Sequence, residues 1–238
     1  MVYNADERVV GDNLSQALLL QRKGEVMFSA GTLSLREFII GEVLPLATLQ
    51  RAILEFLRGR DDAVVFGAQA INAYVSEPRS TQGIDLLSSR AEPLAEELRA
   101  YLAERFHIAV RVRRLDTSLD YRVDQLQKPR SRHLVDIRGT DNMPASQRLA
   151  DILVIAPAQL IATKVIAFSR RKGQPKSGTD WRDVAILLLT FPELKCHPSP
   201  VTDALQAGGA TEVDIQIWTE KFVSREIEAN SEWDDSDE

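Results

Sequence analysis

Two short apolar runs, residues 63–66 and 84–87, stand out in the hydrophobic pattern of the chain. Apolar runs of this length, bounded by turn residues, are typical of buried β-strands. Gly67 closes the first run, and residues 68–74 then have a helix-like composition. The stretch 62–87 therefore predicts a strand, a tight turn, a short helix and a second strand.

Apolar residues at helical spacing predict helices on both sides of this stretch. They recur over residues 35–57, where Pro45 divides the pattern into two helices, and over residues 93–106, where they form one face of an amphipathic helix. Pro157 suits the first turn of a later helix. A loop over residues 173–179 is expected to precede another helix, with the threonine that ends the loop as its N-cap.

Three further segments alternate between apolar and polar residues, as half-buried strands do: 108–115, 119–126 and 133–138. A turn around Pro129 makes the last two a predicted antiparallel pair. Together the elements predict an α+β fold, in which a mixed β-sheet core is flanked by N-terminal helices and a C-terminal helical region. The expected division is an N-terminal helical segment (1–60), an α+β core (61–150), a C-terminal helical region (151–230) and an acidic tail (231–238).

Composition places the chain among globular proteins. Of its 238 residues 44% are hydrophobic and 27% are charged, and no apolar run approaches the roughly 20 residues of a membrane span. The first residues lack a basic start followed by an apolar run, so we expect neither a signal peptide nor a membrane partner. The single cysteine and three scattered histidines argue against a zinc site and favour a cytoplasmic location.

The net charge and its distribution along the chain limit the kinds of ligand that the protein is expected to bind. The net charge of −6 argues against a nonspecific nucleic-acid binder of the basic type. Basic residues nevertheless gather between Lys164 and Arg182, whereas the tail after Glu232 is acidic. A local basic cleft can bind phosphate although the protein as a whole is acidic.

The unit over residues 62–87 resembles the signature of the DNA polymerase β-like nucleotidyltransferases, which is a hydrophobic strand, Gly-Gly or Gly-Ser, and then Asp-x-Asp or Asp-x-Glu. It is similar in particular to AbiEii-toxin-like and other minimal nucleotidyltransferases, where Arg-x-Thr-x-Asp-h-Asp is common (h, hydrophobic). Here that piece runs from Arg79 through Thr81 to Asp85. Gly83 stands where the family has its first metal-binding aspartate, and Ala68 is the second small residue of the glycine pair.

The resemblance implies a site for Mg²⁺ and a nucleoside triphosphate (NTP). Carboxylates two residues apart on a strand share a face and can hold one metal pair. Asp85 keeps the second carboxylate position, and Asp136, a lone acid in an apolar run, matches the third. Asp136 is alternatively the partner of a salt bridge or a charge on an edge strand, and Asp120 or Asp124 are weaker candidates for its role. At the turn, Gly67 and Ala68 would let the backbone approach phosphates, which Arg79 and Thr81 could also contact.

A second similarity to AbiEii-like proteins covers residues 159–184. Lys164 and Arg170 occur at the family's spacing before an Asp-rich helix start that holds Asp180 and Asp183. The resemblance implies that Lys164 faces the metal site and binds triphosphate; the alternative is a lysine whose stem covers apolar surface. Asp180 and Asp183 are expected to orient Lys164 or Arg170, or else to be ordinary acids in a first helical turn.

Taken together, the resemblance implies a toxin-type enzyme that transfers a nucleoside monophosphate (NMP) to RNA, such as tRNA, or to a protein, with an antitoxin as a further partner. Because Gly83 removes one carboxylate, we expect Mg²⁺ to bind weakly or not at all and catalysis to be impaired. The alternative is a non-catalytic nucleotide- or partner-binding protein on the same fold. Gly83→Asp would return the missing carboxylate and is predicted to raise metal-dependent NTP binding.

Overall fold

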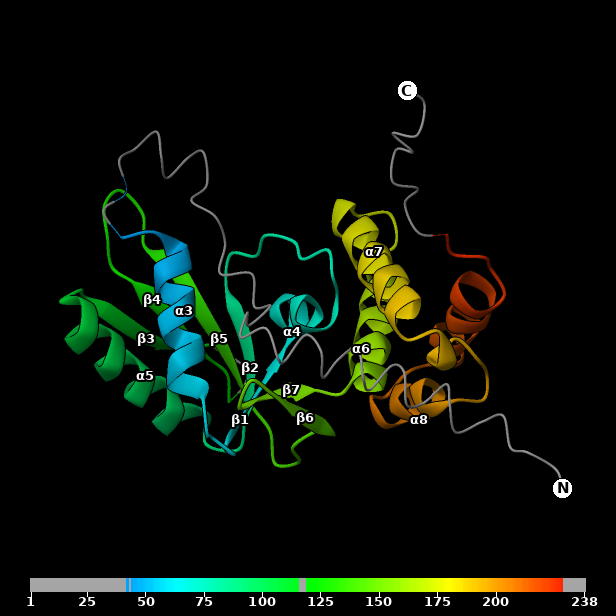
Figure 1. Ribbon diagram of the computed structural model, residues 1–238, viewed down its shortest axis with the longest axis horizontal. Helices are drawn as coiled ribbons and strands as arrows, with labels where there is room; N and C mark the ends of the chain where they lie inside the picture. The colour runs from blue at the N-terminus through cyan, green and yellow to red at the C-terminus, as the bar shows by residue number, and fades with distance from the viewer. Residues whose placement is uncertain (1–41, 43, 116–118, 229–238) are drawn as a thin grey trace, which may run out of the picture.

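The computed structural model describes residue 42, residues 44–115 and residues 119–228 (Figure 1). The first of the two helices predicted over 35–57 and the acidic tail from residue 231 lie outside these ranges. So does most of the N-terminal segment 1–60. The second predicted helix is present as α3 (Leu46–Leu57) and begins directly after Pro45.

A mixed sheet is the centre of the fold. Within the described residues it has seven strands in the order β3-β4-β5-β2-β1-β7-β6. β1 pairs in parallel with β7, and β2 in parallel with β5, whereas the remaining neighbours are antiparallel. The strands are β1 (Ala63–Phe66), β2 (Ile84–Ser88), β3 (Val110–Arg114), β4 (Tyr121–Gln125), β5 (Arg132–Gly139), β6 (Ser146–Leu149) and β7 (Ile152–Ile155).

The helices precede, connect and follow the strands, so the predicted α+β class is confirmed. The predicted antiparallel pairing of β4 with β5 is confirmed as well. After α3 come α4 (Gly67–Tyr74), α5 (Ala91–Phe106), α6 (Pro157–Arg170), α7 (Pro175–Thr190), the short 3₁₀ turn η1 (Pro192–Leu194), α8 (Pro200–Ala207), α9 (Glu212–Ile217) and the π-helical turn η2 (Trp218–Val223).

One local prediction was wrong, and one hairpin was missed. Helix α7 begins at Pro175, inside the predicted loop 173–179, because a proline at the first helical position has the right φ and lacks the N–H that would be unpaired there. The β6–β7 hairpin was not predicted. Its turn consists of Ala150 and Asp151, both at positive φ, instead of the asparagine and glycine that normally mark such a turn.

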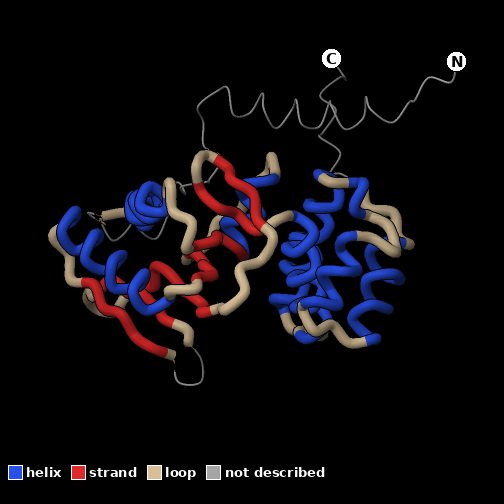
Figure 2. Tube along the Cα trace, turned by 90° about the horizontal axis from the view of Figure 1, so that it is seen from below, coloured by secondary structure: helices blue, strands red, loops and turns tan. Residues whose placement is uncertain are grey.

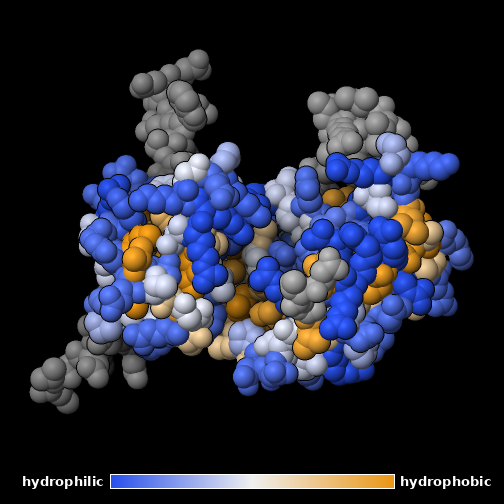
Figure 3. Space-filling view, turned by 180° about the vertical axis from the view of Figure 1, so that it is seen from behind, coloured by the Kyte–Doolittle hydropathy of each residue, from blue (hydrophilic) through white to orange (hydrophobic). Residues whose placement is uncertain are grey.

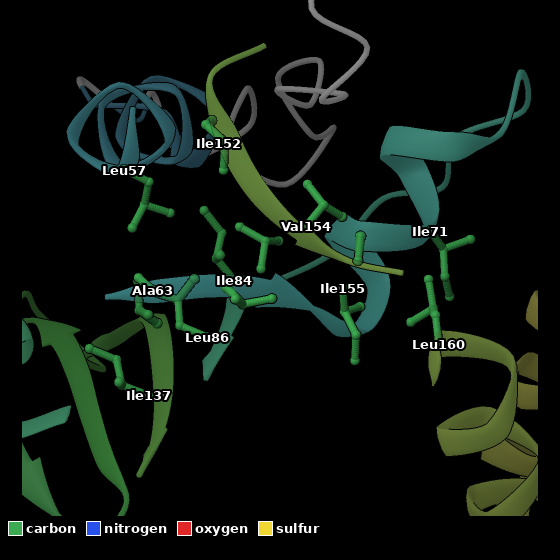
Figure 4. Packing of buried hydrophobic residues seen from close by; sticks show 14 of the residues in the cluster. Leu57, Ala63, Ile71, Ile84, Leu86, Ile137, Ile152, Val154, Ile155 and Leu160 are labelled. Atoms are coloured by element: carbon green, nitrogen blue, oxygen red, sulfur yellow. The ribbon is translucent and has the colours of Figure 1, made fainter. Parts of the chain in front are cut away.

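One face of the sheet is buried under α3 and α5. Helix α5 packs on β3, β4 and β5, and α3 packs on α5 and β5. Side chains that point to this face, among them Ile84, Leu86 and Ile137, are fully buried. Figure 4 shows Leu57 of α3 above the strand that carries Ala63, and Ile71 of α4 pointing toward Leu160 of α6. The same core therefore holds the sheet, α4 and α6 together.

The molecule has a sheet half and a helical half. Figure 2 shows strands with their covering helices on one side and only helices on the other. The surface is hollowed between these halves, with hydrophilic side chains on both sides of the hollow (Figure 3). The sheet continues through β7, past the boundary predicted at residue 150. None of the helices in the described ranges has the length and apolar character needed to cross a membrane.

Candidate functional site

Asp85 and Asp136 lie side by side on the sheet face that α3 and α5 leave uncovered. They are register partners on the parallel strands β2 and β5, and register partners on neighbouring strands point to the same face. The residues that flank Asp85 on its strand, Ile84 and Leu86, point into the core. The alternation of the two strands thus places both carboxylates together, although 50 residues separate them in sequence.

The backbone of Gly67 lies directly against the Asp85 carboxylate. It opens α4 with φ at +69°, and a Cβ atom at this position would lie 2.3 Å from Oδ2 of Asp85. A side chain at residue 67 is excluded both by backbone conformation and by this carboxylate. The strand, the glycine turn and the start of α4 therefore bring the Asp85 carboxylate directly against the backbone, with Ala68 as the next residue of the helix.

The Asp85 carboxylate has an unfavourable environment for a negative charge. Burial raises its pKa above the ordinary range, and the charge of Asp136 raises it further, while Arg138, Lys164 and His133 act in the opposite direction. Among the described residues none forms a hydrogen bond or ion pair with it. A half-buried acid without a direct partner is typical of a functional site.

We expect Asp85→Asn to raise the free energy of unfolding by about 1 kcal/mol at pH 7. Because the folded pKa is raised, ionised Asp85 destabilises the fold at neutral pH, and this penalty vanishes below the pKa of an unfolded aspartate, about 4. Thermal denaturation should therefore show a higher Tm for the variant than for the wild type at pH 7, and no difference in Tm at pH 3. The exposed Asp141→Asn serves as control. A lower Tm at pH 7 would contradict the expectation.

Asp136 is already paired. Nε and Nη2 of Arg122 donate to its two carboxylate oxygens at 2.7 and 3.0 Å. Arg122 lies directly opposite Asp136 on β4. The ion-paired alternative for Asp136 therefore describes its contacts in this structure.

His133 fills the space above Gly83. A Cβ atom on Gly83 would lie 2.6 Å from Nε2 of His133 and 3.3 Å from the carbonyl oxygen of Leu134. The imidazole lies between two carboxylates, with Nε2 3.5 Å from Asp136 and Nδ1 3.9 Å from Asp124, the latter too far for a hydrogen bond. The prediction that Gly83→Asp alone returns a carboxylate overlooked this ring, which has to move first.

The contacts of Asp136 and His133 decide whether this face could bind the two Mg²⁺ ions that the resemblance implies. A metal at this face would need the oxygens of Asp136 that Arg122 holds, and a ligand where His133 stands. Within the described ranges no group of three or more histidine, cysteine, aspartate or glutamate side chains is arranged to hold a metal ion. The residues present therefore do not fit the two-metal clamp.

Lys164 reaches toward this face from α6 and is held by two acids of α7. Its Nζ lies 3.2 Å from Oδ1 of Asp180 and 2.7 Å from Oδ2 of Asp183. Both aspartates are buried, at 1% and 0% exposure, and Lys164 is 13% exposed. Burial raises the pKa of Asp183, but Arg79 and Lys164 outweigh it, so the pKa is lowered overall.

Arg79 joins the same network from the loop after α4. Its Nε and Nη2 donate to the two oxygens of Asp183 at 2.9 and 3.0 Å, and its backbone is fixed by Asn72. Thr81 is used within the loop, where its hydroxyl donates to the carbonyl of Gly83. The network thus ties the β1–α4–β2 unit to the helical half.

Arg170 lies outside this network. Its charge acts on Asp214 near the end of the chain, whereas its neighbour Arg171 donates to Oδ2 of Asp180 at 2.7 Å. Asp180 and Asp183 were expected to orient Lys164 or Arg170: both pair with Lys164, and the arginine that Asp180 holds is Arg171, the residue after the end of α6.

No family model and no curated protein matches the chain. Among solved structures, the Megavirus polyadenylate synthase is similar with a TM-score of 0.53 and 14% sequence identity, over 84% of this chain and 40% of that one. The chain thus spans less than half of that structure's length. Two further structures have lower TM-scores. JHP933 from Helicobacter pylori has a TM-score of 0.47 and 15% identity, over 80% of this chain and 94% of that one. An antigenic nucleotidyltransferase-like protein from Paracoccidioides brasiliensis has a TM-score of 0.42 and 17% identity, over 79% of this chain and 94% of that one. Over the stretch that it covers, the chain shares the α+β fold of the polyadenylate synthase structure.

Proposed function

We propose that this protein is a nucleotidyltransferase-like protein that binds an NTP against β2 and β5 and transfers its NMP poorly. The observation that carries the proposal is the register pairing of Asp85 with Asp136 beside the Gly67 turn. Poor transfer follows from Gly83, which contributes no carboxylate to this face.

The N-terminus of α4 is the proposed place for phosphate. Gly67 and Ala68 open this eight-residue helix, so their backbone N–H groups have no partner within the helix and can donate to an anion. Lys164 and Arg79 both pair with Asp183, which partly neutralises their charges. They are proposed to set the potential of the site and to position the turn.

The finer parts of the proposal rest on resemblance. The motifs around Asp85 and Lys164 support a toxin-type enzyme with RNA, such as tRNA, or a protein as acceptor, an antitoxin as partner and a cytoplasmic location. The similarity in fold to a structure named a polyadenylate synthase is compatible with a polynucleotide acceptor. Magnesium is proposed to bind weakly or not at all, since Arg122 occupies both oxygens of Asp136.

A second candidate function, non-catalytic nucleotide binding, is favoured by the same Arg122–Asp136 contact. Whereas an active enzyme needs Asp136 free for the reaction, a nucleotide-binding protein needs only a face of suitable charge. The two candidates share the ligand and differ in whether any transfer occurs.

Nucleotide titration and label transfer test the proposal together. We expect calorimetry to show NTP binding by the wild-type protein, and radiolabelled NTPs to give weak labelling of total RNA or of protein. Asp85→Ala should abolish that labelling if the protein is an enzyme, whereas labelling equal to the Asp85→Ala background would favour the non-catalytic candidate. An absence of NTP binding would refute both candidates.

A further inference from the structure

The uncovered face of the sheet carries a surplus of arginine. We call the side chains of Arg111, Arg113, Arg122 and Arg138, with those of Asp85, Asp124, His133 and Asp136, the open face. They share one side of β2, β3, β4 and β5 because their positions alternate with the buried ones and pair across the strands. Arg111 and Arg113 share the single carboxylate of Asp124, so the arginines are not fully neutralised.

Arg138 is the least constrained of these cations. It is exposed, its guanidinium lies 5.0 Å from the centre of the Phe66 ring, and among the described residues no carboxylate forms an ion pair with it. Its charge nevertheless acts on Asp85. Arg138 therefore presents an unpaired guanidinium beside the Gly67 turn, since Phe66 precedes that glycine and is the register partner of Asp85.

Arg122 lies where a metal would have to bind. Its contacts to Asp136 use Nε and Nη2, and Nη1 makes no hydrogen bond within the described residues. An arginine fork matches phosphate oxygens as well as carboxylate oxygens, and its charge does not depend on pH in the working range. A guanidinium fixed by Asp136 is thus a pre-positioned donor for a phosphate.

We infer that the open face binds the phosphates of an NTP through arginine side chains, Arg122 and Arg138 foremost, and that this binding needs no divalent metal. The inference rests on the proposed function and specifies how that site holds its ligand. His133 above Gly83 and Arg122 on Asp136 together occupy the places that metal-binding carboxylates would need.

The experiment is a calorimetric titration of the full chain with ATP, once in EDTA and once in MgCl₂. We expect binding in EDTA to be at least as tight as in MgCl₂. Arg138→Met should weaken it about tenfold in both buffers, the effect of losing one charge-assisted hydrogen bond. The matched control is Arg99→Met on α5, on the covered side of the sheet, where Arg99 pairs with Glu96 and no change is expected.

The outcomes separate this inference from the proposed function. Binding of ATP only in MgCl₂ would overturn the arginine site and leave the proposed function standing. Equal affinities for Arg138→Met and wild type, with circular dichroism showing both folded, would also overturn it. Failure to bind ATP in either buffer would refute the proposed function and this inference with it.

Discussion

Asp183→Asn should lower the free energy of unfolding by about 3–5 kcal/mol, the usual cost of removing one partner from a buried ion pair. Asp183 is fully buried and accepts from both arms of the Arg79 guanidinium as well as from Lys164. Asparagine keeps one acceptor oxygen but no charge. Lys164 would then keep only the contact with Asp180, which Arg171 already contacts, and Arg79 would lose the carboxylate that it pairs with.

Urea denaturation at two pH values checks this expectation. The folded pKa of Asp183 is lowered, so its contribution is present above the pKa of an unfolded aspartate, about 4, and is lost as the pH falls through the lower folded value. The difference between variant and wild type should thus be full at pH 7 and shrink below about pH 4. Glu96→Gln, which breaks an exposed pair with Arg99, should cost no more than about 1 kcal/mol. Equal costs for the two variants would contradict a structural role for Asp183.

The double variant Gly83→Asp/His133→Ala is expected to gain metal-dependent NTP binding. Gly83 does not have positive φ, and the nearest atoms to a Cβ at this position belong to the His133 ring. With the imidazole removed, a carboxylate at residue 83 would lie two positions before Asp85 on the same face. We expect Mg²⁺ to tighten NTP binding by about 10–100-fold, the range by which groups around a metal usually change its affinity.

Two single variants make this result interpretable. His133→Ala adds no carboxylate and should show no effect of Mg²⁺, whereas Gly83→Asp should show a smaller effect than the double variant because the imidazole must first move. Calorimetric titrations of NTP with and without Mg²⁺ give the ratio of dissociation constants for each. A folded double variant without any response to Mg²⁺ would show that residues 83–85 do not form a metal clamp in this protein.

The strand–turn–helix–strand unit could be predicted from sequence because its signals are local. The apolar runs end within one residue of β1 and β2, and Gly67 marks the turn between β1 and α4. Pro157 at the start of α6 was informative as well, whereas Pro175 at the start of α7 was read as part of a loop. Such features depend on a few adjacent residues, whose backbone preferences favour one conformation.

The side chains that surround Asp85 and Asp136 in the candidate site could not be predicted in the same way. Arg122 and His133 are significant because of what lies opposite them on neighbouring strands, and register between strands is not local information. The β4–β5 pair was expected, but its irregularity between Val123 and Asp124 shifts the partners beyond it. Asp124, on a strand that was expected to be half-buried, is itself buried and pairs with two arginines of β3.

The two glycines of the site, Gly67 and Gly83, should differ in how much they vary among related sequences. A side chain at residue 67 is excluded by the positive φ of Gly67 as well as by the Asp85 carboxylate. A substitution elsewhere could remove the steric clash but would leave the unfavourable backbone conformation. Gly83 is constrained mainly by the ring of His133, which is the end of a movable side chain. Residues 83 and 133 are therefore expected to covary: an acid at 83 should accompany a small residue at 133, while residue 67 should remain glycine throughout.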